Sequence, residues 1–286
     1  MRFITFSVGD SGAHLGLRRD ADHLVDLTAA GLPRHLEALL AQGDEGLRAA
    51  AQHLAAARHV LPLSQVRILP PLTRPGKALA IGLNYRDHAA ESQFDPPAYP
   101  VVFARYPSSW VAHGEALVCP RVSTQFDYEP ELVAVIGKAG RHIPADRALD
   151  HVAGYSIFNE GSVRDFQLRT NQWTLGKNFD ASGAFGPEFV TRDELPDGAR
   201  GLRIQCRLNG QTLQDANTAD MIFDVATLVA ACSQAMTLHP GDLIITGTPA
   251  GVGLARSPQV WMKPGDVCEV EIDQLGVLRN PVVAEA

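Results

Sequence analysis

The stretch DYEPELVAVIGK, residues 127–138, leads from acidic side chains directly into an apolar run that ends at a glycine. The run at 131–136 is short and rich in β-branched residues, which predicts a buried strand. Glu129 and Glu131 are two positions apart, so on a strand their carboxylates point to one face. Neighbouring carboxylates repel unless they are solvated, share a proton or hold a cation. The stretch predicts either a solvated strand end or a site for a hard cation such as Mg²⁺ or Mn²⁺.

Strand signals dominate the chain around this stretch. Pro130 lacks a backbone N–H, which places it at a sheet edge or a bulge. Beyond residue 77, helical periodicity is confined to about residues 223–236. The chain lacks the regular strand–helix alternation of a doubly wound sheet, so we predict a β-rich α+β fold with a mixed, largely antiparallel core. Further strands are expected at 78–82, 101–104, 153–158, 202–208, 243–246 and 268–272.

The first 70 residues form a separate pattern. They predict a small α+β unit, and the proline-rich segment 69–76 has the composition of a linker. We therefore expect a small N-terminal domain at 1–70 and a second, larger domain at 71–286. The expected strands of the first domain are 2–7, 14–17 and 23–27, and its expected helices are 34–42 and 45–58.

Composition excludes several classes of protein. Of 286 residues, 45% are hydrophobic and 20% charged, which is typical of a globular chain. The net charge of −7 argues against a nucleic-acid partner. No apolar run is long enough to span a membrane, no signal-peptide pattern opens the chain, and the four cysteines show no CxxC spacing. We expect a cytoplasmic protein with no membrane or nucleic-acid partner.

A histidine and a glutamate follow the strand expected at 78–82. His88 and Glu91 are three positions apart, close enough on a helical turn for a hydrogen bond. A carboxylate that orients a histidine makes a general base near neutral pH. The same spacing also occurs in ordinary surface pairs, so the residues alone leave both interpretations open.

A second polar cluster follows the strand expected at 153–158. Glu160, Arg164 and Gln167 have spacings of four and three, which places them on one face if the segment is helical. One interpretation is a surface ion pair between the first two. The other is a metal ligand followed by an arginine and an amide that face an anionic substrate.

Two loops carry further candidates. Lys177 lies between glycine and asparagine in TLGKNFD (174–180) and is one of only four lysines. A lysine there neutralises an enolate or a carboxylate, or is ordinary surface charge. The loop GTPAGVG (247–253) lacks the GK[ST] ending of a nucleotide-binding loop, so we interpret Thr248 as a ligand contact instead.

In their order along the chain, these motifs resemble the fumarylacetoacetate hydrolase family, of the shorter bacterial acylpyruvate hydrolase type. The resemblance covers about residues 77–282 and implies a mixed β-sandwich roll behind a small N-terminal domain, usually as a homodimer. It rests on IGLNYRDHAAES (81–92), DYEPELVAVIGK (127–138), GYSIFNEGSVRDFQ (154–167), LGKNFD (175–180), MIFDV (221–225) and PGDLIITGTPAGVG (240–253).

The resemblance also implies roles for single residues. One Mg²⁺ or Mn²⁺ per subunit would be held by Glu129, Glu131 and Glu160, and relatives commonly carry aspartate at the last position. It also implies a catalytic dyad formed by His88 and Glu91, and an active-site lysine at Lys177. The implied substrate contacts are Arg164, Gln167 and Thr248.

From this resemblance we expect a metal-dependent hydrolase that cleaves a C–C bond in a 2,4-dioxo acid, such as an acylpyruvate or fumarylpyruvate of aromatic catabolism. His88 would activate the water that attacks the distal carbonyl, and Lys177 would help to stabilise the pyruvate enolate. Segments 94–99 and 172–173 would contact the distal acyl group. The alternatives are a decarboxylase or an isomerase or tautomerase of a related 2-oxo acid, a hydrolase of a didehydro-deoxy sugar acid, and a non-catalytic keto-acid-binding protein.

Overall fold

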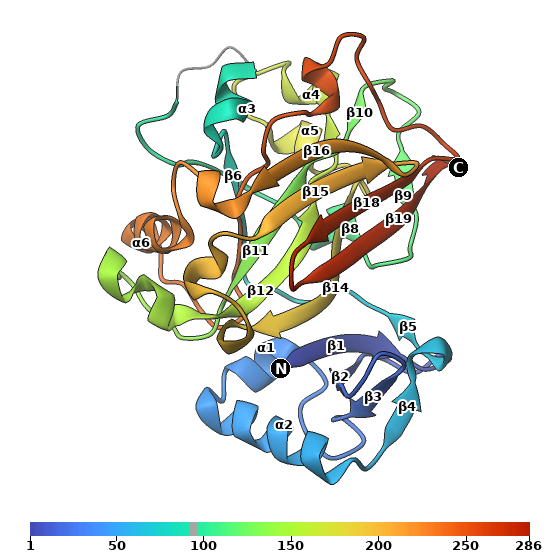
Figure 1. Ribbon diagram of the computed structural model, residues 1–286, viewed down its shortest axis with the longest axis vertical. Helices are drawn as coiled ribbons and strands as arrows, with labels where there is room; N and C mark the ends of the chain where they lie inside the picture. The colour runs from blue at the N-terminus through green and yellow to red at the C-terminus, as the bar shows by residue number, and fades with distance from the viewer. Residues whose placement is uncertain (92–95) are drawn as a thin grey trace.

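The computed structural model describes residues 1–91 and 96–286 and shows two β-sheets packed face to face (Figure 1). The first sheet has the strand order β4-β3-β2-β1-β14-β12-β11-β17-β6-β7, with β5 paired to β1 and β8 paired to β14. Its strands are β1 (Arg2–Ser7), β2 (His14–Arg18), β3 (His23–Asp26), β4 (Val60–Pro62), β5 (Arg67–Ile68), β6 (Ala78–Gly82), β7 (Val101–Ala104), β8 (Trp110–Val111), β11 (Pro130–Ile136), β12 (Val152–Asn159), β14 (Gly183–Thr191) and β17 (Leu243–Ile245).

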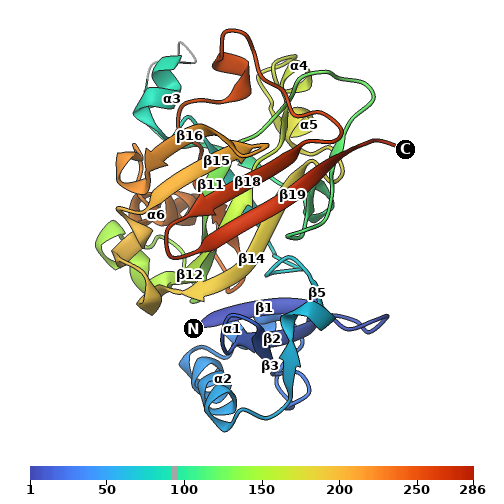
Figure 2. The same ribbon diagram turned by 45° about the vertical axis from the view of Figure 1, so that its right-hand side comes forward.

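The second sheet lies across the first and closes the core, as Figure 2 shows. Its strand order is β16-β15-β18-β19-β9, and a two-stranded pair, β10 with β13, lies apart from both sheets. The strands are β9 (Leu117–Cys119), β10 (Phe126–Asp127), β13 (Ser162–Val163), β15 (Arg203–Leu208), β16 (Gln211–Asn217), β18 (Val267–Ile272) and β19 (Gly276–Ala284). Together the sheets form the predicted β-rich α+β sandwich.

Helices are short and lie at the periphery of the sheets (Figure 1). Helix α6 (Val225–Ala235) covers the sandwich core. Asp224 caps its first turn, because the Asp224 side chain accepts a hydrogen bond from the Thr227 N–H. Within the described ranges, no helix has both the length and the apolar character needed to cross a membrane. The α-helices are α1 (Leu36–Leu40), α2 (Asp44–Ala56), α3 (Arg86–Glu91), α4 (Arg164–Gln167), α5 (Thr174–Lys177) and α6 (Val225–Ala235).

Strand β11 lies inside the first sheet, between β12 and β17. All of its residues are buried, which explains why its sequence is a continuous apolar run rather than an alternating one. Pro130 is the first residue of this strand and pairs with Asn159 of β12, whereas β17 pairs only with Val133–Val135, so the expected edge exists at Pro130 on one side of the strand. A proline is tolerated there because the first residue of a strand does not need to donate to the ladder.

The N-terminal strands continue the first sheet, because β1 pairs antiparallel with β14. Leu36 and Leu39 of α1 belong to the same buried cluster as Val133 and Val135 of β11. The division into domains at residue 70 stays a prediction. Strand β14 was missed from the sequence, because Gly186 and Pro187 interrupt its apolar pattern.

Candidate active site

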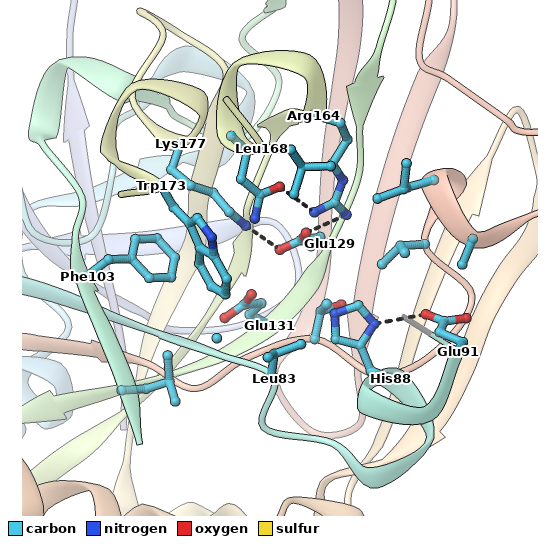
Figure 3. A pocket seen from close by; sticks show the side chains of 17 residues that line it. Leu83, His88, Glu91, Phe103, Glu129, Glu131, Arg164, Leu168, Trp173 and Lys177 are labelled. Carbon is cyan, nitrogen blue, oxygen red and sulfur yellow. Dashed lines mark hydrogen bonds and ion pairs between the residues drawn. The ribbon is translucent and has the colours of Figure 1, made fainter. Parts of the chain in front are cut away.

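A cavity of about 340 Å³ opens where β6, α3, the start of β11, α4, α5 and the loop after β17 meet (Figure 3). Most of the residues singled out in the sequence line it, and they come from segments more than 150 positions apart. Predicted site residues on its wall are His88, Glu91, Glu129, Glu131, Arg164, Gln167, Lys177 and Thr248. The ninth, Glu160, is fully buried behind this wall.

Glu129 lies at the centre of a buried network of charges. Its carboxylate is 2.6 Å from Arg164 Nη2 and 2.8 Å from Lys177 Nζ. The Arg164 Nε also donates to Asp127 Oδ2 at 2.8 Å, and its Nη1 donates to Gln167 Oε1 at 2.9 Å. Both cations are therefore held by carboxylates inside the protein. Of the two interpretations left open above, the surface ion pair between Arg164 and Glu160 is not formed.

The other two glutamates of the network are less well compensated. Glu131 accepts a hydrogen bond from the Gly247 N–H at 2.5 Å. Glu160 Oε1 is 3.5 Å from Arg105 Nη1 and 3.7 Å from Lys177 Nζ. Its second oxygen, Oε2, is buried without a hydrogen-bond partner among the described residues.

The pKa values of the three glutamates follow from how well neighbouring positive charges compensate each carboxylate. Burial raises the pKa of Glu129, but the charges of Arg164 and Lys177 outweigh burial and bring the pKa to about 2. For Glu131, burial and the negative charges of Glu160 and Glu129 together hold the pKa well above the usual range. Burial also raises the pKa of Glu160, against the opposing charges of Lys177 and Arg105. The network therefore carries an excess of carboxylates for the cations it contains.

His88 and Glu91 form the predicted pair on α3, on the opposite side of the cavity from Lys177 (Figure 3). The His88 Nδ1 is 2.8 Å from Glu91 Oε1, and Glu91 Oε2 accepts a hydrogen bond from the Gly251 N–H at 2.8 Å. The glutamate thus fixes the histidine ring and ties α3 to the loop after β17. Because Nδ1 faces a carboxylate, it carries a proton, which leaves Nε2 as the nitrogen that exchanges protons with a ligand.

Arg105 was not predicted, and a single arginine after a strand gives no sequence signal for it. Its side chain is completely buried behind Glu160. The guanidinium donates to the carbonyl oxygens of Gly161 and Ser109, both at 3.2 Å. A Cβ on Gly183 would lie 2.5 Å from Arg105 Nη2, so that glycine makes room for the guanidinium. Arg105 supplies the third positive charge of the network.

The rest of the cavity lining is apolar. Trp173 packs edge-on against Phe103, with ring centroids 5.6 Å apart. A Cβ on Gly82 would lie 2.2 Å from Trp173 Cζ3, so the indole rests directly on the backbone of β6. Trp173 was expected at the distal acyl group, and it does line the cavity. Of the other segment expected there, residues 94 and 95 lie outside the described residues.

The donor set of the network fits a hard divalent cation such as Mg²⁺ or Mn²⁺, which prefers carboxylate oxygens. The Glu160 Oε2 is buried without a donor among the described residues, and burial and the neighbouring carboxylates hold the pKa of Glu131 well above its usual range; a bound cation would relieve both. In the described ranges, no three His, Cys, Asp or Glu side chains already converge at ligand distances, and Arg164 and Lys177 hold Glu129 instead. The ligand set Glu129, Glu131 and Glu160 therefore stays a prediction.

Comparison with known proteins decides the family. The family model described as fumarylacetoacetate (FAA) hydrolase C-terminal matches residues 77–283. This chain belongs to the fumarylacetoacetate hydrolase family. The match includes every predicted site residue, and the recognition made from the motifs is confirmed.

Relatives in this family carry out more than one reaction. Human mitochondrial oxaloacetate tautomerase FAHD2A is 43% identical over 277 residues, which are 95% of this chain and 88% of that protein. A fumarylacetoacetate hydrolase structure from Exiguobacterium antarcticum is 33% identical with a TM-score of 0.84, and covers 100% of both chains. Maleylpyruvate hydrolase from Sphingobium, in complex with manganese(II) and pyruvate, is 29% identical with a TM-score of 0.83, again over 100% of both chains.

Members of this enzyme family thus include both hydrolases and tautomerases, and the sandwich fold is shared with them. A divalent metal occurs in the family, because the Sphingobium structure contains manganese. The human relative is a mitochondrial protein by name, whereas we expect this chain in the cytoplasm.

Proposed function

We propose that this protein catalyses keto–enol tautomerisation of a 2-oxo acid, with a divalent metal ion bound in the site. The observation that carries this proposal is the His88–Glu91 pair, which faces a buried carboxylate–cation network across one small cavity. Tautomerisation moves one proton between an oxygen and the neighbouring carbon, so it needs a positioned acid–base group and charge stabilisation next to it.

The acid–base group is His88. With Nδ1–H held by Glu91, the free Nε2 takes a proton from C3 of the keto form, and as imidazolium it returns a proton to C3 of the enol form. In the enol-to-keto direction the enol O–H proton passes to solvent water and His88 takes up one proton from solvent, so the number of protons is conserved. Lys177 lies beside the carboxylates and offers its ammonium group to the enolate oxygen.

A bound Mg²⁺ or Mn²⁺, held by Glu129, Glu131 and Glu160, would supply positive charge to the carboxylate and 2-oxo oxygens of the substrate. Arg164 and Gln167 hold one side of the network, and Thr248 places a hydroxyl on the cavity wall. The Thr248 Oγ1 accepts a hydrogen bond from Gln214 Nε2 at 3.1 Å, which fixes its position.

The choice of tautomerisation is supported by the human relative, which is an oxaloacetate tautomerase by name and matches 95% of this chain. A second candidate is hydrolysis of a C–C bond in a 2,4-dioxo acid, which the Sphingobium maleylpyruvate hydrolase with bound manganese and pyruvate favours. In that reaction His88 takes a proton from water, which attacks the distal carbonyl, and the bond breaks to leave an enolate. Both reactions use the same base and the same enolate.

One experiment separates the two reactions. The purified protein, loaded with Mg²⁺ or Mn²⁺, is given the enol form of a 2,4-dioxo acid, which both reactions can use, and decay of the enol absorbance is followed while NMR identifies the products. We expect faster ketonisation without bond cleavage, and loss of the acceleration in His88→Ala. Cleavage to pyruvate would establish the hydrolase, and release of CO₂ a decarboxylase. Full activity in His88→Ala would refute the proposed base.

Two further proposals concern the assembly and compartment. We propose a homodimer, which light scattering of the purified protein tests directly. We also propose a cytoplasmic location, which differs from the mitochondrial location in the human relative's name and which cell fractionation tests.

A further inference from the structure

Helix α3, which carries the proposed acid–base pair, is firmly attached to the protein at its start. Asn84, two residues before the helix, is completely buried, and its Oδ1 accepts a hydrogen bond from the Phe223 N–H at 2.8 Å. The Asn84 Nδ2 donates to the Thr246 carbonyl oxygen at 2.7 Å, and these bonds hold Leu83 in a left-handed backbone conformation with φ of +55°. The fold therefore fixes the first end of the helix.

A single side-chain hydrogen bond attaches the other end. Glu91 is the last residue of α3, and its Oε2 accepts a hydrogen bond from the Gly251 N–H at 2.8 Å. In the part of the chain that the structure describes, no other side chain of α3 forms a hydrogen bond to a segment outside the helix. The place of Gly251 therefore decides where Glu91, and through it His88, is held.

Gly251 depends on its neighbours for that place. It lies in the loop after β17 with φ of +101°, a backbone conformation that favours glycine, and glycine is the least restrained residue. A Cβ at this position would lie 2.6 Å from the Leu213 carbonyl oxygen, so the loop packs directly on β16. The Gly251 carbonyl oxygen accepts hydrogen bonds from Arg256 Nε at 3.1 Å and from the Tyr128 hydroxyl at 3.4 Å.

Arg256 binds two backbone carbonyl groups at once. Its Nε donates to the Gly251 carbonyl oxygen in the loop, and its Nη2 donates to the Leu213 carbonyl oxygen in β16. A guanidinium presents its N–H groups in a rigid planar fork, which suits a contact with two acceptors. This two-point contact joins the loop to β16 at the residue that holds Glu91.

We propose that Arg256 is a positioning residue of the active site, which acts through Gly251 and Glu91 on the orientation of His88. The inference rests on the proposed function only for the role of His88 as the acid–base group. Arg256 lies outside the cavity lining, so it acts on the site through the loop. It keeps the Gly251 N–H directed at Glu91 Oε2, which leaves Oε1 for His88 Nδ1. Without it, the imidazole loses the partner that keeps the proton on Nδ1.

The rest of the loop has attachments of its own. Gln214 of β16 donates from Nε2 to the Pro249 carbonyl oxygen at 2.8 Å, and Asp127 Oδ1 accepts a hydrogen bond from the Gly253 N–H at 2.7 Å. Neither bond involves Arg256. Substitutions of this arginine are therefore expected to release one point of the loop in a protein that still folds.

The tautomer of the neutral His88 imidazole tests the proposal without turnover. ¹⁵N NMR of the Mg²⁺-loaded protein at alkaline pH distinguishes Nδ1–H from Nε2–H, and comparison with His88→Ala assigns the signals. We expect the Nδ1–H form in the wild type and a shift of the ring ¹⁵N signals toward the Nε2–H form in Arg256→Met. Arg192→Met is the matched control and should keep the wild-type signals, because Arg192 also donates to a backbone carbonyl, that of Leu149 at 2.7 Å, but lies outside the cavity lining and the loop. Wild-type signals in Arg256→Met would overturn the proposal.

Arg256→Lys separates the two-point contact from the charge. Lysine keeps the positive charge but offers a single ammonium group in place of the fork. We expect its His88 signals to shift in the same direction as those of Arg256→Met, and wild-type signals in Arg256→Lys would overturn the two-point contact. If Arg256→Met does not melt cooperatively, Arg256→Lys alone decides the test.

A double-mutant cycle shows whether Arg256 acts through Glu91. Alone, Arg256→Met should lower kcat for ketonisation by about 10–100-fold. In the Glu91→Gln background it should lower kcat further by less than about threefold, because the link that it supports is already broken. Equal losses in the two backgrounds would show that the residues act independently and would overturn the proposal.

The two measurements separate this inference from the proposed function. A shifted tautomer in Arg256→Met would support the positioning role even if the wild type ketonises no 2-oxo acid. Conversely, a wild type that ketonises its substrate, together with wild-type ¹⁵N signals in Arg256→Met, would leave the proposed function standing and overturn the role of Arg256.

Discussion

Replacement of Glu91 by glutamine isolates the orientation of His88 from the rest of the site. The wild-type carboxylate uses one oxygen for His88 Nδ1 and the other for the Gly251 N–H, each at 2.8 Å. Both partners donate to it, and an amide offers only one acceptor oxygen. In Glu91→Gln the amide either loses the bond to Gly251 or presents its NH₂ to Nδ1. The second arrangement moves the histidine proton to Nε2 and removes the base.

The expected loss in kcat is about 10²–10⁴-fold, the contribution of a positioned acid–base group. At about 1.36 kcal/mol for each factor of ten, this is about 2.7–5.4 kcal/mol in activation free energy. His88 is buried, Glu91 is 21% exposed, and the substitution removes one hydrogen bond, so the free energy of unfolding should fall by about 0.5–1.5 kcal/mol. Activity and stability therefore separate in this variant.

Decay of the enol absorbance measures the activity, and thermal unfolding followed by circular dichroism measures the stability. Asp87→Asn, an exposed position on the same helix outside the cavity lining, is the matched control and should keep wild-type activity. A Glu91→Gln protein that melts like the wild type and keeps more than about one third of its kcat would show that Glu91 does not orient His88.

Three further changes have defined outcomes. Arg105→Met removes the nearer of the two cations beside Glu160 and leaves only Lys177 at 3.7 Å, so the free energy of unfolding should fall by about 3 kcal/mol, measured by urea titration; a loss below about 1 kcal/mol would contradict the buried pair. Gly82→Ala forces Trp173 off β6, so we expect the free energy of unfolding to fall by about 1–3 kcal/mol and the tryptophan fluorescence to change. Unchanged emission would disprove the contact. Removal of divalent metal by a chelator should abolish activity and added Mn²⁺ should restore it, whereas full activity after chelation would exclude the metal.

The sequence predicted those parts of the molecule that have a local pattern. The apolar run of β11 is buried on both faces, so its sequence alone predicts a strand. The spacing of His88 and Glu91 likewise predicted that both lie on one turn of a helix, which is α3. Strand β14 was not predictable in the same way, because Gly186 and Pro187 break its pattern while pairing with β12 and β1 holds it in the sheet. Tertiary pairing there overrides local propensity.

The charge balance of the site depends on contacts between distant segments, which no local pattern encodes. Arg105 follows an ordinary strand, and only the fold brings it behind Glu160. Asp127 belongs to the opening motif, but its two hydrogen bonds to the backbone of the loop at Gly253 and Leu254 appear only in the structure. Leu83 has no sequence signal for its left-handed backbone, because the hydrogen bonds of Asn84 impose it.

Exchange of the C3 protons of a 2-oxo acid with solvent tests the central claim most directly, because it detects proton transfer at carbon whatever the later product. NMR of 2-oxobutanoate in D₂O, with the Mg²⁺- or Mn²⁺-loaded protein, follows this exchange. We predict that the wild type accelerates loss of the C3 proton signal and that His88→Ala returns it to the rate in buffer. Exchange at the buffer rate with the wild type, or equal acceleration by His88→Ala, would contradict the assignment of His88 as the acid–base group of a 2-oxo acid enzyme.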